Sequence, residues 1–349
     1  MNPFVLAILL LPWALEPQSL VASSHWLLAW VGLELNTLAI LPLMTRQPHP
    51  RAVEATTKYF LIQAAAAATL LFAATTNAWI TGQWEIHQMV HPIPTAIATL
   101  ALAMKVGLAP THFWLPEVLQ GLDLTTGLIL STWQKLAPFA LLFQIPHHNP
   151  TMLIILGLSS TLVGGWAGPN QTQLRKILAY SSIAHLGWMI LVLQFSPSLT
   201  FLTLILYITM TFSAFTVLKM NNSTNINSLT ISWAKTPALA AITPLILLSL
   251  GGLPPLSGFM PKWLIIQELT KQGLALTATV AALSALLSLY FYLRLAYAAT
   301  LTMPPNTPSG MPPWRLCTTQ STLPLALMTT ITLALLPLTP LVVALFISC

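Results

Sequence analysis

The chain has 349 residues, of which 13 are Lys or Arg and 7 are Asp or Glu, so that only 6% are charged while 56% are hydrophobic. An ordinary soluble domain contains about 25% charged residues. A soluble fold with so little charge would expose a mostly apolar surface to water. Composition therefore excludes a soluble, disordered or nucleic-acid-binding protein, despite the net charge of +6, and predicts an integral membrane protein.

Cofactor motifs are missing from the sequence. The two cysteines, Cys317 and Cys349, are too few for a four-cysteine zinc or iron–sulfur site. No glycine-rich nucleotide-binding motif occurs. We therefore expect this chain to bind no cofactor and no metal of its own.

Apolar stretches long enough to cross a bilayer as a helix, roughly 20 residues, follow one another along the chain. They lie near residues 3–21, 25–44, 57–80, 94–116, 122–143, 151–168, 174–194, 199–219, 237–270, 274–299 and 323–347. The apolar runs are continuous rather than alternating, which favours helices over a β-barrel. The predicted fold is all-α, a polytopic bundle of about eleven transmembrane helices, with residues 1–349 forming a single transmembrane domain.

The positive charges predict the orientation of this bundle. With eleven spans and the N-terminus on the inner face, nine cations fall in or beside the inner loops, whereas only Lys271 falls on the opposite side. The nine are Arg46, Arg51, Lys58, Arg175, Lys176, Lys219, Lys235, Arg294 and Arg315. Such an excess marks the inner side of a membrane protein. The C-terminus is then expected on the outer face.

Three lysines, Lys105, Lys135 and Lys262, remain inside the predicted spans, together with Glu34. An ionisable group at the bilayer centre costs about 2.5–3.5 kcal/mol on insertion scales, and such groups commonly mark ion pathways. A buried Glu–Lys pair that only fixes helix packing, or a lysine that reaches the membrane surface, is the structural alternative. The clustering favours a proton relay.

Proline interrupts two of the predicted spans next to these lysines. Residues 105–116 contain Pro110 and Pro116, and residues 251–262 contain Pro254, Pro255 and Pro261. Proline frees a backbone carbonyl within a helix, which in a membrane is tolerated only against protein or water. Paired interrupted helices point to an ion or substrate site near the midplane.

Two histidines extend the candidate site. His112 follows the first interruption, and His185 lies in the middle of a predicted span. Histidine titrates near neutral pH and can shuttle protons. A hydrogen-bonded histidine with a purely structural role remains an equal alternative for each.

Five sequence runs are more specific than membrane helices in general: Ser23–Trp26, Lys58–Leu61, Thr132–Pro138, Asn170–Ile177 and Leu250–Phe259. Together they resemble the chain 2 family of vertebrate mitochondrial NADH–ubiquinone oxidoreductase (respiratory complex I), one of the antiporter-like subunit families. The resemblance extends over essentially the whole chain. It implies a proton-translocating membrane subunit whose complex carries NADH, FMN, iron–sulfur clusters and ubiquinone on other subunits.

The resemblance also implies roles for single residues. Glu34 is expected to pair with Lys105, Lys135 to be the central relay lysine, and Lys262 to be the terminal one. His112 and His185 match positions on the family's hydrated central axis. The implied partners are other membrane-arm subunits, including neighbouring antiporter-like subunits, and phospholipids such as cardiolipin. The implied location is the mitochondrial inner membrane, with the N-terminus in the matrix and the C-terminus in the intermembrane space.

Two other functions remain open at this stage. A self-contained secondary cation/proton antiporter would have the same fold and relay, and ion flux by the purified chain alone would favour it. A membrane scaffold with inert charges is the third interpretation. Neutral substitutions at Glu34 and Lys105 that left turnover and pumping intact would support the scaffold.

Overall fold

The structure, a computed structural model, describes residues 23–46, 49–146, 150–234, 236–301 and 322–347. Regular structure in these ranges is helical apart from two isolated β-bridges. The chain divides into two compact units, residues 1–156 and 157–349, and each is described by itself. The predicted span at 3–21, together with Lys235 and Arg315, lies outside the described residues.

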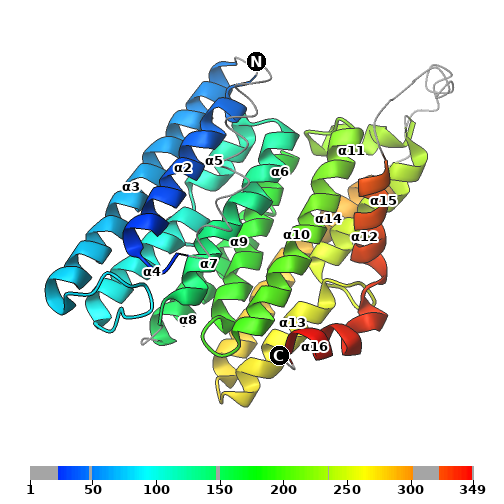
Figure 1. Ribbon diagram of the computed structural model, residues 1–349. Helices are drawn as coiled ribbons and strands as arrows, with labels where there is room; N and C mark the ends of the chain where they lie inside the picture. The colour runs from blue at the N-terminus through cyan, green and yellow to red at the C-terminus, as the bar shows by residue number, and fades with distance from the viewer. Residues whose placement is uncertain (1–22, 47–48, 147–149, 235, 302–321, 348–349) are drawn as a thin grey trace. The chain divides into compact units, whose positions relative to one another are not determined.

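The first unit is built on two long neighbouring helices, α2 (Trp26–Met44) and α3 (Pro50–Thr81) (Figure 1). Two shorter helices, α4 (Pro92–Val106) and α5 (Trp114–Gly121), both pack against α3. The remaining elements are α6 (Leu124–Thr132), the 3₁₀ turn η1 (Trp133–Lys135) and α7 (Leu136–Gln144). Helix α8 (Pro150–Ala167) runs from the first unit into the second.

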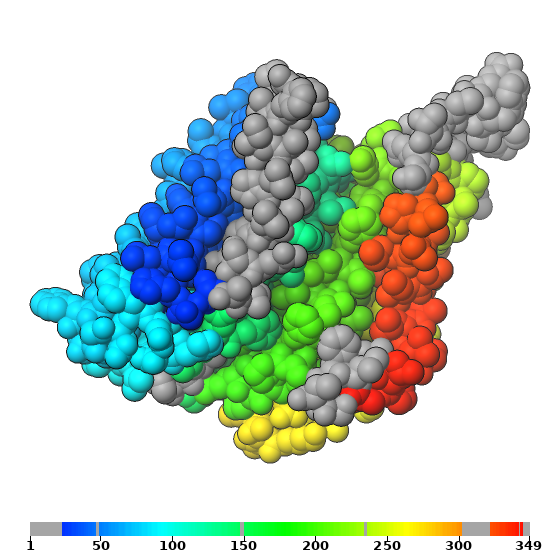
Figure 2. All heavy atoms as spheres, viewed as in Figure 1, coloured from blue at the N-terminus to red at the C-terminus, as the bar shows by residue number. Residues whose placement is uncertain are grey.

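The second unit contains α9 (Leu174–Val192), α10 (Pro197–Met220), α11 (Ile226–Ile231), η2 (Ser232–Ala234), α12 (Pro237–Gly251), α13 (Phe259–Lys271) and α14 (Ala275–Leu301). It ends with α15 (Leu323–Ala334), η5 (Leu336–Leu338) and α16 (Thr339–Ile347). Helix α12 packs extensively against α14, and α9 contacts α10, α13 and α14. In the space-filling view α15, drawn in orange, forms part of the outer face of this unit (Figure 2).

Proline and histidine set where many helices begin. Proline occupies the first turn of α3, α4, α10 and α12, where its missing N–H costs no helical hydrogen bond. His25, His49 and His91 each cap a helix, because the ring nitrogen Nδ1 accepts a hydrogen bond from the backbone N–H two residues later. These three histidines therefore have structural partners near the helix ends.

Five helices within the described ranges are long and apolar enough to cross a membrane: α2, α3, α8, α10 and α14. Both interruptions expected from the sequence are present, between α4 and α5 and between α12 and α13. The helices on either side of each interruption, α4, α5, α12 and α13, are each shorter than a single crossing of the membrane requires. Two further discontinuities, η1 within predicted span 122–143 and η5 within 323–347, were not anticipated.

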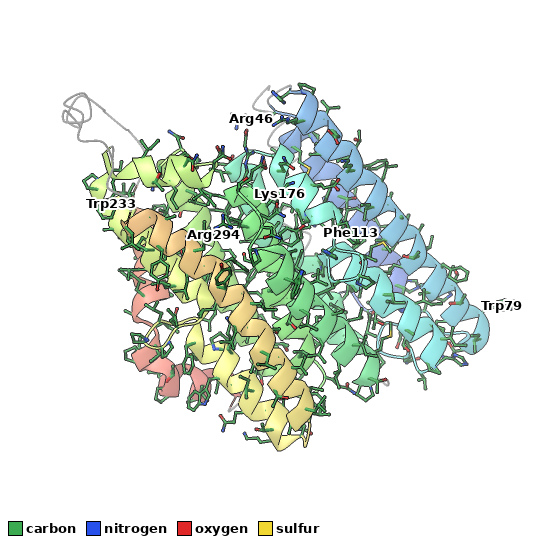
Figure 3. All side chains as sticks on the ribbon, turned by 180° about the vertical axis from the view of Figure 1, so that it is seen from behind. Arg46, Trp79, Phe113, Lys176, Trp233 and Arg294 are labelled. Carbon is green, nitrogen blue, oxygen red and sulfur yellow. The ribbon has the colours of Figure 1, made fainter. Side chains whose placement is uncertain are left out.

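The outward faces of several helices carry large apolar side chains. Helix α15 exposes Leu323, Leu327 and Ile331, which recur every four residues and so share one face of the helix. In the first unit Trp79, 89% exposed, lies at one end of the α2–α3 pair and Arg46 at the other (Figure 3). Apolar outward faces with an aromatic residue near a helix end are typical of lipid-exposed helices.

Candidate functional site

Lys105 lies in the last turn of α4, directly before the first interruption, and its side chain is only 6% exposed. The helix ends because Gly107 adopts a left-handed conformation with φ of 88°. Residues with a Cβ rarely adopt this conformation, so the glycine allows the break. A cation at a helix C-terminus is stabilised by the carbonyl end of the helix dipole.

Two side chains cap the carbonyl groups that this interruption exposes. The indole N–H of Trp114 donates to the carbonyl of Met104 over 3.2 Å. The amide Nε2 of Gln63, from α3, donates to the carbonyl of Lys105 itself over 3.3 Å. Because an unpaired buried carbonyl is costly in an apolar surrounding, these bonds hold the end of α4 in a defined place.

Lys135 lies in the 3₁₀ turn between α6 and α7 and is 4% exposed. The preceding residue, Gln134, donates its amide Nε2 to Oδ1 of Asn36 on α2 over 2.7 Å. Asn36 is 98 positions away in the chain and is itself buried. This bond ties the discontinuity that carries Lys135 to the face of α2.

One cavity within the first unit brings the two lysines together. The volume in it that is open to a water molecule is about 20 Å³, which is room for about one ordered water. Its lining consists of Leu33, Asn36, Thr37, Tyr59, Gln63, Lys105, Val106, Trp114, Leu130, Gln134, Lys135 and Pro138. Amide, hydroxyl and ammonium groups on the wall can each hydrogen bond to water, which makes the cavity suited to ordered water between Lys105 and Lys135.

Glu34 lies on α2 beside this cavity but does not line it. The α2 residues on the cavity wall are Leu33, Asn36 and Thr37. Within the described residues the Glu34 carboxylate makes no ion pair, and its buried Oε2 atom has no hydrogen-bond partner. The pairing of Glu34 with Lys105 that the resemblance implied is not among the ion pairs of the described residues.

His112 lies in the connection between α4 and α5 and is 5% exposed, whereas its neighbour Phe113 points outward (Figure 3). The two rings lie 4.3 Å apart. Atom Nδ1 of His112 makes no hydrogen bond to the described part of the chain. This nitrogen is buried without a hydrogen-bond partner among the described residues.

In the second unit, Lys262 contacts the end of the other interrupted helix. Its ammonium Nζ donates to the carbonyl of Gly251, the last residue of α12, over 2.7 Å. The next residue, Gly252, has φ of 78° and lies against the lysine side chain. A Cβ at Gly252 would stand 2.9 Å from Cδ of Lys262. The two interruptions thus have the same design, a left-handed glycine at the helix end with a lysine beside it.

His185 is buried in the middle of α9, where its ring lies 5.7 Å from the ring of Tyr207 on α10. The structure places His185 and Lys262 in the second unit, and it places Glu34, Lys105, His112 and Lys135 in the first. The amide residues of the cavity wall, Asn36, Gln63 and Gln134, were not among the predicted site residues. Their signal in the sequence is an isolated amide within an apolar span.

No group of three His, Cys, Asp or Glu that could hold a metal occurs among the residues that the structure describes. The ion pairs found there lie near helix ends. Lys58 bridges Glu54 and Glu117 over 2.6 and 2.7 Å, and Lys271 lies 3.7 Å from Glu268. The buried polar groups of the described helices include lysine, histidine, amide and hydroxyl side chains, of which lysine and histidine can take up and release a proton.

Two family models together cover almost the whole chain. Residues 23–288 match the family described as "NADH:quinone oxidoreductase/Mrp antiporter, TM". Residues 289–343 match "NADH dehydrogenase subunit 2 C-terminus". Among known proteins, NADH-ubiquinone oxidoreductase chain 2 of Salmo salar is 69% identical over 346 residues, covering 99% of both chains. The chain belongs to the NADH–ubiquinone oxidoreductase chain 2 family. The same protein of Danio rerio is 64% identical over 341 residues, covering 97% of this chain and 98% of the relative.

Solved structures agree with this family. A chain of respiratory complex I from Thermus thermophilus is 31% identical with a TM-score of 0.83, covering 97% of this chain and 79% of the other. A chain of the Mrp complex from Dietzia is 19% identical with a TM-score of 0.83, covering 96% of this chain and 75% of the other, and so shows the shared fold alone.

Family membership establishes the general function. The chain is an antiporter-like membrane subunit of complex I, the NADH:ubiquinone oxidoreductase, and takes part in proton translocation. The broken helices and the lysines beside them lie within the matched region.

Proposed function

We propose that this chain moves protons through its interior by way of buried lysine side chains. The observation that carries the proposal is a small polar cavity, with a volume of about 20 Å³ open to a water molecule, that is lined by both Lys105 and Lys135. Water between the two lysines can pass a proton from the ammonium group of one to the neutral amine of the other, because each lysine nitrogen can release and regain a proton. Lysines that only fixed packing would need no shared space with amide and hydroxyl walls.

Each candidate residue has a role in this proposal. Glu34 modulates Lys105 by its charge from the neighbouring turn of α2, since the two do not form a direct ion pair. Lys105 passes its proton to Lys135, and Lys262 is the terminal lysine of the relay. His112 and His185 exchange protons with water along the path. The hydrogen bond from Lys262 to Gly251 supports a defined proton-holding position at the second interruption.

We propose eleven spans, with the N-terminus in the mitochondrial matrix and the C-terminus in the intermembrane space. The ends of the second unit support this sidedness. The guanidinium of Arg294 donates to the carbonyl of Pro169, and the loop at Gln173 forms a β-bridge with Asn225. Arg175, Lys176, Lys219 and Arg294 therefore gather at one end of the unit, whereas Lys271 precedes the opposite end of α14.

The proposed partners follow from the same topology. The chain assembles with other membrane-arm subunits, including neighbouring antiporter-like subunits, and its exposed apolar faces contact phospholipids such as cardiolipin. NADH, FMN, iron–sulfur clusters and ubiquinone are bound by other subunits of the complex. Residues 1–349 act as one transmembrane domain.

The test is the substitution Lys135→Met in complex I assembled with the variant chain and reconstituted into liposomes. We expect fewer protons translocated for each NADH oxidised. Lys271→Met is the matched control, because it removes a lysine that is 62% exposed and lies outside the spans. A proton-to-NADH ratio that is the same in both variants and in the unsubstituted complex would disprove the role of Lys135.

A further inference from the structure

The second unit contains two buried tyrosines that no role described above uses. Tyr207 on α10 and Tyr292 on α14 are each only 1% exposed. Both helices pack against α9 (Figure 1), which carries His185. Tyrosines at the surface of a membrane helix, such as Tyr290 and Tyr297, are common lipid contacts, but a buried phenol hydroxyl needs a polar partner.

Two consecutive serines of α9 lie beside these tyrosines. Tyr207 hydrogen bonds with Ser182, whereas the Tyr292 hydroxyl lies near Ser181 without a well-formed hydrogen bond. Both serine hydroxyls already donate to backbone carbonyls three residues earlier, Ser181 to Leu178 and Ser182 to Ala179, each over 2.7 Å. Their oxygen lone pairs are therefore the groups that remain to accept hydrogen bonds from the phenols.

The cluster of Ser181, Ser182, Tyr207 and Tyr292, called here the hydroxyl cluster, touches His185 on one side. Ser181 and Ser182 precede His185 by four and three residues, so all three share one face of α9. The ring of Tyr207 lies 5.7 Å from the His185 ring. His185 therefore lies close to the two serines on its own helix and to Tyr207 on α10.

On the other side, the hydroxyl cluster reaches the second interrupted helix. A Cβ placed on Gly251 would lie 3.6 Å from Cδ2 of Tyr292, so the tyrosine ring packs directly against the end of α12. The carbonyl of this same Gly251 accepts the hydrogen bond from Nζ of Lys262. The hydroxyl of Tyr292 is buried and makes no well-formed hydrogen bond within the described residues, which leaves it able to rotate between partners.

We infer that the hydroxyl cluster carries protons between His185 and Lys262, with Tyr207 and Tyr292 as its proton-transferring members. The inference rests on the proposed function, because it needs Lys262 to be a relay lysine. In each transfer a hydroxyl oxygen accepts one proton on a lone pair and releases its own proton to the next acceptor. Each O–H bond that breaks is replaced by one that forms, so the hydroxyls are unchanged after they rotate back.

The test is Tyr292→Phe in assembled complex I reconstituted into liposomes, with Tyr207→Phe measured in parallel. Each change removes one hydroxyl and keeps the ring that packs the core. We expect proton translocation to slow at least about tenfold, because a positioned proton-transfer group commonly contributes about 10²-fold or more. Tyr290→Phe is the matched control on the same helix, since Tyr290 is 61% exposed, and it should translocate at the unsubstituted rate.

Three outcomes separate the inference from the proposed function. If Lys262→Met slows translocation but both tyrosine variants behave like Tyr290→Phe, the hydroxyl cluster is not a path and the inference fails alone. If Lys262→Met also has no effect, the proposed role of Lys262 fails. If a tyrosine variant does not assemble on a native gel, Ser181→Ala removes another hydroxyl of the cluster instead, and unchanged translocation in that variant would equally overturn the inference.

Discussion

The side-chain amide of Gln63 on α3 donates a hydrogen bond to the backbone carbonyl of Lys105, 42 positions away, at the point where α4 ends. Gln63 is 4% exposed and also lines the cavity shared by the two lysines. Gln63, on the uninterrupted helix α3, therefore fixes the position of Lys105 at the end of the interrupted helix α4. Lys105 is thus held at its backbone by a side chain of another helix.

Replacing this amide should affect both stability and translocation. Gln63→Leu leaves the carbonyl of Lys105 without this donor, and we expect the assembled complex to lose about 1–3 kcal/mol of stability. Because the end of α4 is then held less firmly, we also expect slower proton translocation. The measurements are the melting temperature of the purified complex and the proton-to-NADH ratio in liposomes.

A matched control for this change is Gln272→Leu. Gln272 is an exposed glutamine whose amide donates to Glu268 over 3.3 Å at the surface. Gln272→Leu should alter neither the melting temperature nor the proton-to-NADH ratio, because exposed polar groups exchange their partners for water at little cost. A normal proton-to-NADH ratio in Gln63→Leu would show that the bond serves stability alone.

The sequence predicted the interrupted helices and the buried lysines because their signals are local. Pro110 follows Lys105 by five residues, and Pro254 and Pro255 precede Lys262 by eight and seven, so each break and its lysine could be seen together. The contacts that build the cavity are not local. Gln63 meets Lys105, and Asn36 meets Gln134, only when separate helices pack together.

Two further features were not predicted. The 3₁₀ turn Trp133–Lys135 is followed by Pro138, which has no N–H to donate to the carbonyl of Gln134 four residues earlier, so this break also had a local signal. The bond from Gln134 to Asn36 ties the turn to α2. The side on which Glu34 lies depends on the rotation of α2 about its axis, which apolar sequence on nearly every face of that helix does not define.

The hydrogen bond between Gln134 and Asn36 can be measured with a double-mutant cycle. Asn36→Leu and Gln134→Leu should each destabilise the complex by about 1–3 kcal/mol, because each leaves one buried amide without its partner. The double variant should lose less stability than the sum of the losses in the two single variants. The difference, which is the coupling energy, should be about 0.5–3 kcal/mol. Melting temperatures of the four complexes provide the comparison.

The same cycle on the exposed Gln272 and Glu268 pair serves as the control, and its coupling energy should be close to zero. Equal coupling in the two cycles would mean that the buried bond does not hold Lys135 in its turn. Proton translocation should also fall in the double variant even where its stability recovers, because the cavity wall then lacks two polar groups that hold water.

The glycine at the second interruption offers a prediction with a closely matched control. In Gly252→Ala the new methyl group would stand 2.9 Å from Cδ and 3.0 Å from Nζ of Lys262, so the lysine must move away from the carbonyl of Gly251. The left-handed φ of 78° adds a backbone cost of roughly 1–2 kcal/mol. We expect lower stability together with slower proton translocation.

Gly273→Ala separates these two effects. Gly273 has nearly the same conformation, φ of 74°, but a Cβ there would have nothing within 4 Å. Gly273→Ala therefore has the backbone cost without the contact to Lys262, and we expect a smaller loss of melting temperature with an unchanged proton-to-NADH ratio. If both alanine variants lowered that ratio equally, strain in the backbone would account for the defect. The position of the Lys262 ammonium at the end of α12 would then have no part in translocation.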